Sequence, residues 1–301
     1  MPTAVPAAAS AAVLAVLAAP SVGDPAAPTA FRFADVADPQ LSVLDLGATR
    51  GDGVFETLGV NGGRAQAVEG HLQRLARSAA LLELPEPDLV AWRETVIAVA
   101  ERLPADREGS VKLVYTRGPE GTGPATGWAT GTVAPDHGLA RTRGIDVVLL
   151  DRGVAHDVTA SAPWLLQGAK TLSYAVNMAA LREARRRGAD DALFVSSDGV
   201  LLEGATSSLL LKRGDRLVTP STGLGILAGT TQADAFRFAR AQGVTTSYEV
   251  LPRTALDEAD ALWLLSSVRL AAPIRSVDGV ARPIDAELTG RLNEALLARR
   301  D

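Results

Sequence analysis

The sequence predicts an α+β protein of two domains. Its 301 residues suit two domains of ordinary size or one large one. With 47% hydrophobic and 22% charged residues, the chain can bury a full core and lacks the composition of a disordered protein. Strand-like and helix-like segments follow one another without the regular succession of a doubly wound sheet. Because residues 151–168 lack strong periodicity and form a plausible linker, we divide the chain into domains at 1–150 and 151–301.

An Ala-rich segment lies near the start of the sequence. Residues 7–19 resemble the apolar core of a secretory signal peptide, but no Lys or Arg precedes them and the run is too short to span a bilayer. We therefore predict an irregular tail that leads into a first strand at 13–17. The signal peptide stays as the alternative interpretation.

Apolar periodicity and turn signals define the elements of the first half. The run at 54–60 has strand composition and is followed by the hairpin signal Asn61-Gly62-Gly63. Leu72, Leu75 and Leu82 share one face of a helical pattern. The predicted elements are strands at 13–17, 54–60, 110–116 and 145–150, helices at 71–82 and 89–103, and a Gly- and Pro-rich loop at 118–131.

The second half combines helical patterns with several short apolar runs. A long helical pattern begins at Tyr174, and the short runs bounded by Gly, Ser or Asp indicate strands. The predicted elements are helices at 174–187, 231–241 and 286–299, strands at 192–195, 200–202, 207–211, 217–218 and 261–265, and a loop at 269–275.

Composition excludes several classes of function. A formal net charge of −5 without a basic stripe argues against a nucleic-acid partner. The absence of cysteine excludes disulfides and thiolate metal sites and favours a cytoplasmic protein. The histidines, His71, His137 and His156, lie far apart in sequence, so we predict no metal site. We expect a small-molecule substrate and no membrane association.

Lysine is scarce, with three among thirty Lys and Arg residues. A desolvated lysine can lose its proton and attack a carbonyl as a free amine, whereas arginine stays charged. Lys170 lies between the turn signal at Gly168 and the helical pattern that begins at Tyr174. We therefore place the chemistry at Lys170. A solvated surface charge is the alternative interpretation of this residue.

Other features of the second half complement an amine. Glu203 follows an apolar strand and opens a run of small residues. Residues 227–231, Leu-Ala-Gly-Thr-Thr, stand where a helix begins, and its free N–H groups and dipole suit a phosphate. Ser266 and Ser267 add hydroxyls at another strand end. An amine, a carboxylate and a phosphate cradle are what pyridoxal phosphate requires, for its aldehyde, its ring nitrogen and its phosphate.

Short motifs recur in a fixed order along the chain: Arg50-Gly-Asp-Gly-Val-Phe-Glu-Thr57, His71-Leu-Gln-Arg-Leu75, Lys170-Thr-Leu-Ser-Tyr174, Asp191-Ala-Leu-Phe-Val195, Glu203-Gly-Ala-Thr-Ser-Ser208 and Gly225-Ile-Leu-Ala-Gly-Thr-Thr231. In this order they resemble the fold-type IV pyridoxal-phosphate enzymes, which include aminotransferases and aminodeoxychorismate lyases. The resemblance covers residues 50–301. It implies a small N-terminal α+β domain, a larger C-terminal one, pyridoxal phosphate in the cleft between them, and a homodimer.

The resemblance also assigns roles to single residues. Lys170 resembles the Schiff-base lysine and proton shuttle, and Glu203 resembles the partner of the pyridine nitrogen. Arg74 resembles the arginine that grips the phosphate, although the residue pattern alone indicates an exposed helix face. The other implied cofactor contacts are Thr230 and Thr231 at the phosphate, Leu227 under the ring, Tyr174 near the ring hydroxyl, and Ser207 and Ser267. Ser173, Ser208 and Gln232 depart from the commonest family pattern.

Within this family, the segments 51–57, 111–117 and 225–231 look most similar to aminodeoxychorismate lyases. The resemblance implies conversion of 4-amino-4-deoxychorismate to 4-aminobenzoate and pyruvate. The alternative is an aminotransferase for D-amino or branched-chain amino acids, because the two activities share the cofactor-binding residues. A cofactor carrier without turnover is the alternative from another class, and the presence of both Lys170 and Glu203 speaks against it.

A dianionic substrate requires cations at the mouth of the cleft. Arg117 and Lys112 are the candidates for substrate binding, with Arg50 and Arg269 as weaker ones. Alternation along the strand places Lys112 on the face opposite Leu113, so it is also expected to face water.

Overall fold

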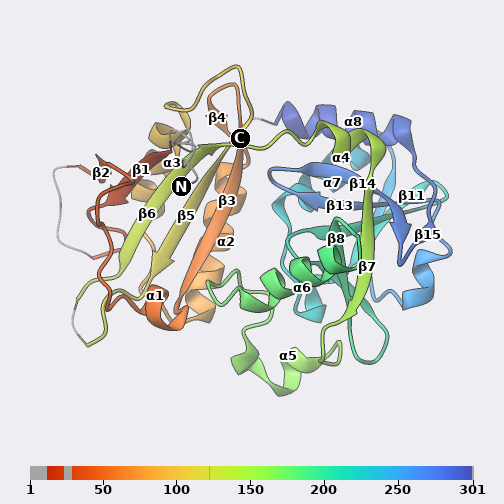
Figure 1. The fold of residues 1–301 in the computed structure, drawn as a ribbon, viewed down its shortest axis with the longest axis horizontal. Helices are drawn as coiled ribbons and strands as arrows, with labels where there is room; N and C mark the ends of the chain where they lie inside the picture. Colours follow the sequence, from red (N-terminus) through yellow and green to blue (C-terminus); the bar gives the residue numbers. More distant parts are fainter. Residues whose placement is uncertain (1–11, 24–28, 122, 300–301) are drawn as a thin grey trace, which may run out of the picture.

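The structure is a computed structural model that describes residues 12–23, 29–121 and 123–299. Two β-sheets lie side by side, each with its own helices (Figure 1). The first sheet is formed by strands between residues 13 and 133, and the second by strands between residues 145 and 281. The α+β organisation in two parts, predicted from the sequence, is confirmed.

The first sheet is antiparallel, in the order β2-β1-β6-β5-β3-β4. Its strands are β1 (Val13–Leu17), β2 (Phe31–Ala34), β3 (Gly53–Asn61), β4 (Arg64–Ala65), β5 (Gly109–Thr116) and β6 (Thr126–Val133). Val111 and Leu113 point into the core, whereas Lys112 between them is exposed, as alternation along the strand predicts. The first strand at 13–17 is confirmed; the Ala-rich residues 7–11 lie outside the described residues.

Helices pack on one face of this sheet: α2 (Val68–Leu81) and α3 (Leu89–Ala100), with the short α1 (Leu46–Arg50) at its edge. Asp88 caps α3 by accepting from the N–H groups of Val90 and Ala91. Trp92 of α3 meets Tyr115 of β5 edge to face, with ring centroids 5.9 Å apart. Both rings are fully buried, so the helix and the sheet share one core.

Strand β6 corrects the prediction of a loop at 118–131. The segment was interpreted as a loop because it is rich in glycine, yet Thr126–Val133 pairs with both β1 and β5. A Cβ at Gly127 would come within 2.9 Å of Trp92, and one at Gly131 within 2.7 Å of Val99. Here glycine allows α3 to approach the strand closely, which is a recognised reason for glycine inside a sheet.

The second sheet follows the order β12-β11-β10-β13-β14-β7-β8-β9, with β15 paired to β14. Its strands are β7 (Ile145–Asp151), β8 (Asp191–Val195), β9 (Leu201–Gly204), β10 (Ser208–Arg213), β11 (Arg216–Pro220), β12 (Thr245–Glu249), β13 (Ala261–Ser266), β14 (Leu270–Val277) and β15 (Val280–Ala281). The prediction of a loop at 269–275 is wrong. Residues 270–277 form strand β14, in which Pro273 lies opposite Trp263 of β13.

Strand β7 also moves the predicted domain boundary. It lies between β14 and β8 and is parallel to both, so it belongs to the second sheet. The division at residue 150 therefore cuts through an element of the second domain. The change between sheets occurs at 134–144, where helix α4 (Gly138–Arg143) already packs on β14. A short apolar strand carries no local sign of which sheet it joins, so the sequence could not place this boundary.

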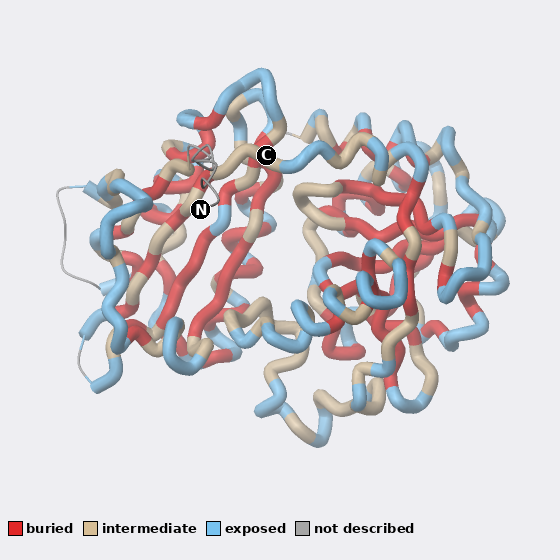
Figure 2. Tube along the Cα trace, in the orientation of Figure 1, coloured by how far each residue is buried: buried red, intermediate tan, exposed pale blue. Residues whose placement is uncertain are grey.

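The remaining helices surround the second sheet: α5 (Val158–Ser161), α6 (Ala175–Arg186), α7 (Thr230–Ala241) and α8 (Ala286–Leu297). The 3₁₀ turns are Pro163–Leu165, Thr222–Leu224 and Arg253–Leu256. Figure 2 shows that burial concentrates in the two sheets, whereas α5 and much of α6 remain accessible. The predicted helices at 174–187, 231–241 and 286–299 are thereby confirmed to within two residues at each end.

The two domains are joined along one edge of β3. Phe55 N donates to Lys170 O at 3.0 Å, and Leu172 N donates to Gly53 O at 2.8 Å. Residues 170–172 therefore extend the edge of the first sheet, although they follow β7 of the second domain in the chain.

Side-chain contacts reinforce this junction. Arg141 forms two hydrogen bonds of 2.6 Å with Glu108, and Gln66 Nε2 donates to Leu297 O at 2.8 Å. A Cβ at Gly59 would come within 2.5 Å of the carbonyl oxygen of Ser267, so the turn after β13 lies directly against β3. The space between the sheets is thus closed on several sides.

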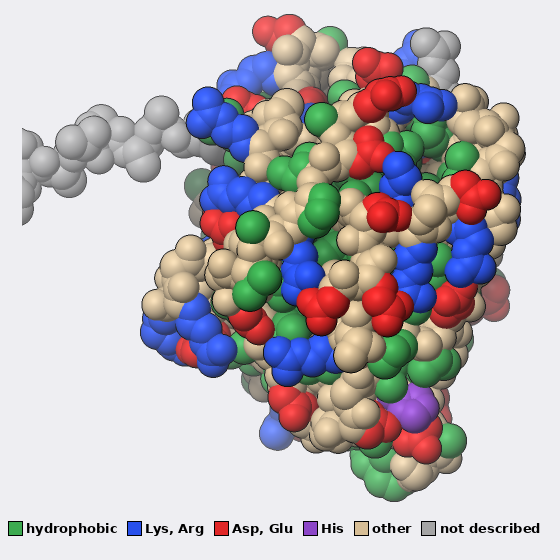
Figure 3. Space-filling model, turned by 90° about the vertical axis from the view of Figure 1, so that its right-hand side faces the viewer, with side chains coloured by type: hydrophobic (Ala, Val, Ile, Leu, Met, Phe, Trp, Pro, Cys, Tyr) green, Lys and Arg blue, Asp and Glu red, His purple; other side chains and the backbone are tan. Residues whose placement is uncertain are grey.

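Two surface properties complete the description. On the face of the second domain shown in Figure 3, acidic and basic side chains are interspersed, so no field of one sign develops there. Among the residues that the structure describes, no helix combines the length and apolar character needed to cross a membrane.

Candidate active site

Lys170 is held from both sides at the domain junction. Its N–H donates to Ser78 Oγ of α2 at 3.1 Å, and its carbonyl oxygen accepts from Phe55 N. With the backbone fixed, the side chain runs over aromatic rings: Nζ lies 4.3 Å from the ring centroid of Phe55 and 5.7 Å from that of Tyr174. The scarce lysine therefore points into the junction rather than into solvent.

Burial lowers the pKa of Lys170 to about 8. Desolvation favours the uncharged amine, the carboxylates of Glu56 and Glu203 oppose it, and the positive charges of Arg74 and Lys112 support it. An amine with a pKa near 8 is partly neutral at physiological pH, which is what nucleophilic attack on a carbonyl requires.

Glu203 is the carboxylate on the second-domain side. It stands at the end of β9, and its Oε2 accepts from Leu227 N at 3.2 Å. Burial raises the pKa of Glu203 to about 7, although the Leu227 N–H and the charge of Lys170 oppose this shift. Tyr174 donates its hydroxyl to Ala205 O at 3.1 Å, and burial raises its pKa to about 12, so it remains a neutral donor.

Hydroxyl groups gather where α7 begins. Ser267 Oγ lies 3.5 Å from Thr230 Oγ1 and 3.3 Å from Thr231 Oγ1. Gly229 is the N-cap of α7, and among the described residues no side chain caps this helix. A Cβ at Gly229 would come within 2.3 Å of Ser208 Oγ, so a side chain at this position would displace the Ser208 hydroxyl. Open N–H groups, helix dipole and hydroxyls together form an anion cradle.

Arg74 lies directly behind this cradle. Its Nη1 donates to Ala228 O at 2.9 Å, and its Nε and Nη2 donate to the two oxygens of Glu56 at 2.7 Å each. Arg74 is only 5% exposed, so the pattern that suggested an open helix face was misleading. Burial alone would raise the pKa of Glu56, but Arg74 and His71 outweigh it and hold that pKa well below its usual range.

The sequence analysis missed two members of this cluster. The sequence analysis weighed His71 as a metal ligand and otherwise gave His71 and Glu56 only as members of family motifs, without a role. Glu56 lies inside β3, which is otherwise mostly apolar, and is fully buried. A charged residue in such a strand is rare unless it is paired, and that signal could have identified it.

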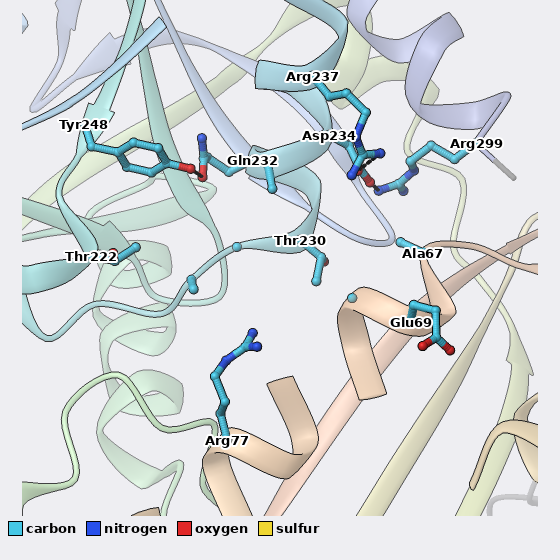
Figure 4. A pocket seen from close by; sticks show the side chains of 14 residues that line it. Ala67, Glu69, Arg77, Thr222, Thr230, Gln232, Asp234, Arg237, Tyr248 and Arg299 are labelled. Carbon is cyan, nitrogen blue, oxygen red and sulfur yellow. Dashed lines mark hydrogen bonds and ion pairs between the residues drawn. The ribbon is translucent and has the colours of Figure 1, made fainter. Parts of the chain in front are cut away.

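A cavity of about 550 Å³ borders the outer side of the cradle (Figure 4). It is lined by residues 228–230 together with side chains of α2 and α7, and Asp234 there pairs with Arg237 at 2.7 Å and with Arg299 at 2.9 Å. Neither Lys170 nor Glu203 lines it. This cavity is therefore adjacent to the cradle and distinct from the space around Lys170.

Several predicted residues lie elsewhere. The guanidinium of Arg117 donates hydrogen bonds to Asp52 and to carbonyl oxygens just after α2, so it connects the end of β5 to that helix instead of facing the junction. Arg269 donates to the buried Asp191 at 2.6 Å, and Arg50 is exposed at the end of α1. These cations are not brought to Lys170.

Lys112 and Ser207 have intermediate outcomes. Lys112 is exposed, as alternation predicted, yet its Nζ lies 5.1 Å from the ring centroid of Phe55, whose ring also contacts Lys170. Ser207 Oγ is buried against Gly204 and has no hydrogen-bond partner within the described part of the chain. Its neighbour Ser208, rather than Ser207, underlies the cradle at Gly229.

The residues present fit pyridoxal phosphate in three respects. An amine of lowered pKa can react with an aldehyde, a partly buried carboxylate can pair with a ring nitrogen, and a helix N-terminus without a side-chain cap can bind a phosphate. Lys170, Glu203 and the cradle residues come from segments far apart in the chain and converge at one junction.

Comparisons with known proteins give a family match and several similar proteins. Residues 53–277 match the family described as amino-transferase class IV. The bifunctional aminodeoxychorismate lyase / D-amino acid transaminase of Mycobacterium tuberculosis is 46% identical over 255 residues, covering 81% of this chain and 88% of that protein. The solved structure of the fold IV-transaminase CpuTA1 from Curtobacterium pusillum is 50% identical with a TM-score of 0.90, covering 95% and 97% of the two chains. The PLP-bound form of a hypothetical aminotransferase from Mycobacterium tuberculosis is 41% identical with a TM-score of 0.85, covering 95% and 99%.

Proposed function

Because this chain belongs to the class IV aminotransferase family, we propose that it is a pyridoxal-phosphate enzyme that converts 4-amino-4-deoxychorismate to 4-aminobenzoate and pyruvate. The observation that carries the cofactor chemistry is the desolvated amine of Lys170 between the rings of Phe55 and Tyr174. The lyase activity is supported by the Mycobacterium tuberculosis relative, whose name includes it. Transamination of D-amino acids is the second candidate, because that name includes it as well.

The cofactor supplies an electron sink for the pair of electrons left when a proton leaves the amine-bearing carbon of the substrate. Three parts of the chain hold it. Arg74 and the cradle at Thr230 and Thr231 would bind the phosphate, Glu203 would pair with the ring nitrogen, and Lys170 would bind the aldehyde end. Leu227 and Tyr174 would contact the ring, as the family resemblance implies.

Lys170 is proposed as the base that moves the proton. Its pKa near 8 lets Nζ accept a proton from the substrate carbon and give it to the departing enolpyruvyl oxygen. Glu203 stays at the opposite end, and its carboxylate accepts a hydrogen bond from the ring nitrogen. Loss of pyruvate aromatises the remaining ring, which drives the reaction forward without an amino acceptor.

Lys112 is proposed to bind a substrate carboxylate. It is exposed, and the Phe55 ring lies close to both Lys112 and Lys170. A positive charge at this place suits substrates with two carboxylates, and both 4-amino-4-deoxychorismate and acidic keto acids have them. Arg117 and Arg269, whose guanidinium groups bind Asp52 and Asp191, are no longer candidates.

The test of the activity is a pair of incubations with the cofactor-loaded protein. One contains 4-amino-4-deoxychorismate, with 4-aminobenzoate and pyruvate measured, and the other contains D-alanine and 2-oxoglutarate, with D-glutamate measured. We expect aminobenzoate and pyruvate in equal amounts. Transamination without any aminobenzoate would replace the lyase assignment by the aminotransferase one. Product in neither incubation, with cofactor bound, would support a carrier.

The role of Lys112 has a matched control in the chain. Lys212 is the other lysine outside the site, and it pairs with Asp285 at 2.7 Å in the second domain. An exposed ion pair contributes up to about 1 kcal/mol, so Lys112→Met should lower kcat/KM by about fivefold. Lys212→Met should leave it unchanged. Equal effects of the two substitutions would remove Lys112 from the site.

We also propose a homodimer, as the family resemblance implies. Val176 and Met178 on α6 are 51% and 41% exposed, and such apolar side chains favour an interface. Sedimentation velocity of the purified protein tests this proposal, and a monomer at micromolar concentration would refute it. The cytoplasmic location stays a prediction from composition.

A further inference from the structure

A buried histidine connects the anion cradle to a carboxylate. His71 is fully buried. Its Nδ1 lies 2.7 Å from Glu56 Oε2, while its Nε2 lies 3.1 Å from Thr230 Oγ1 and 3.2 Å from Ser267 Oγ. One imidazole thus touches two of the hydroxyls that form the cradle, and on its other side it touches the carboxylate that binds Arg74.

The protonation of Nδ1 follows from its partner. Arg74 holds Glu56 in its ionised form, and an ionised carboxylate only accepts hydrogen bonds. Nδ1 therefore carries a hydrogen and donates it to Glu56. Only Nε2 of His71 remains variable: it is an acceptor in the neutral ring and a donor in the imidazolium.

The state of Nε2 decides how the cradle hydroxyls point. If Nε2 accepts, either Thr230 or Ser267 donates its single hydroxyl hydrogen to the imidazole. The oxygen of that hydroxyl then presents only lone pairs to a ligand in the cradle. If Nε2 donates, both hydroxyls keep their hydrogens for a ligand. An anion with three acceptor oxygens is bound well only by the second arrangement.

We propose that His71 takes up one proton from solvent when a phosphate dianion binds in the cradle, and that the resulting imidazolium orients Thr230 and Ser267 as donors to it. His71 is thus a positioning residue that acts through these hydroxyls. The inference rests on the proposed function, because the cradle is assigned there to the cofactor's phosphate.

The surrounding charges make the neutral ring the resting state. Burial lowers the pKa of His71, Glu56 on β3 opposes this, and the positive charges of Arg74 on α2 and Arg299 after α8 add to it. The groups that α7 and the turn after β13 present, Thr230 and Ser267, are uncharged. A bound dianion adds the negative charge that reverses this balance.

The experiment uses the whole protein without cofactor and inorganic phosphate as the probe. Phosphate has neither an aldehyde nor a ring nitrogen, so Lys170 and Glu203 do not contribute to the signal. Ring ¹⁵N spectra of histidine-labelled protein are recorded with and without saturating phosphate at about pH 8, where the probe is mainly a dianion. The chain contains only three histidines, so His71→Gln and His156→Gln assign the signals.

We expect the His71 signals to change from the neutral Nδ1–H tautomer to the doubly protonated ring. Calorimetry in two buffers of different ionisation enthalpy should show uptake of about one proton per bound phosphate, and the Kd should rise about tenfold per pH unit over the range in which the free ring is neutral and the bound ring is protonated. Glutamine places a donor near Nε2 that cannot titrate, so His71→Gln should retain binding and lose both the uptake and the pH dependence. His156 pairs with Asp198 at the surface, so His156→Gln is the matched control and should retain both.

The outcomes separate this inference from the proposed function. Phosphate that binds, shown by its ³¹P shift, while His71 stays neutral overturns the inference and leaves the cradle intact. Unchanged proton uptake in His71→Gln has the same meaning. Failure of phosphate to bind at all overturns the cradle and the inference together. The wild-type spectra decide the question even where His71→Gln does not fold.

Discussion

The partly buried carboxylate of Glu203 gives the protein without cofactor a distinctive dependence of stability on pH. Its pKa lies at about 7 instead of the ordinary 4.5 because of burial. The stability contributed by the protonated form is therefore fully present below pH 4.5 and is lost as the pH rises through about 7. Each pKa unit corresponds to about 1.36 kcal/mol, so the loss amounts to about 3 kcal/mol. Glu203→Gln keeps the shape of the side chain and removes the charge.

The measurement is the free energy of unfolding by urea of both cofactor-free proteins from about pH 4 to pH 9. The relevant quantity is the difference between Glu203→Gln and wild type, because every other titrating group is common to both. We expect this difference to be constant below pH 4.5 and to grow in favour of Glu203→Gln by about 3 kcal/mol above pH 7. A difference that stays level across the range would show that Glu203 is not desolvated, and the reasoning about its ring-nitrogen role would fail with it.

Three other predictions concern the neighbourhood of this site. Arg74→Met should lower the free energy of unfolding by urea by about 3–5 kcal/mol, because it leaves the Glu56 carboxylate buried without its main partner. The double variant Arg74→Met/Glu56→Gln should regain more than half of the lost stability. A double variant no more stable than Arg74→Met would contradict the ion-pair account. The rate of pyridoxal phosphate attachment to Lys170, followed by absorbance, should rise about tenfold per pH unit up to about pH 8 and then level off, since only the neutral amine attacks; a flat profile would refute the lowered pKa. Gly131→Ala should lower the free energy of unfolding by about 1–3 kcal/mol, because its Cβ would lie 2.7 Å from a side chain of α3. Gly290→Ala, on the open surface of α8, should leave this free energy unchanged or raise it. Equal effects of the two substitutions would speak against tight packing at β6.

The sequence predicted the elements that carry strong periodicity. The longer helices were predicted to within a few residues, because their apolar residues recur every three to four positions, whereas the short helices α1, α4 and α5 were not predicted. The strands that it missed lack such a signal. Glycine and proline usually indicate a loop. In β6, however, the glycines face helix α3, and in β14 Pro273 lies inside a sheet, so tertiary packing overrides the local preference at both places.

The residues of the candidate site also divide into those with a local signal in the sequence and those without one. Lys170 was selected because lysine is scarce, and Glu203 because it follows an apolar strand, and both signals are local in the sequence. Arg117 was misassigned because its partner Asp52 is 65 positions away in the chain, and pairing over that distance has no local signature. The Glu56–His71 contact, 15 positions apart across a strand and a helix, was missed for the same reason.

The attachment of residues 170–172 to the edge of β3 has a mechanical consequence. Lys170 is attached through its backbone to the first domain, whereas the phosphate cradle and Glu203 belong to the second domain. A cofactor held at Lys170, Glu203 and the cradle would therefore link the two domains. If its aldehyde end left Lys170, Arg74 of α2 and the direct contacts at the domain junction would still hold the two halves of the molecule together.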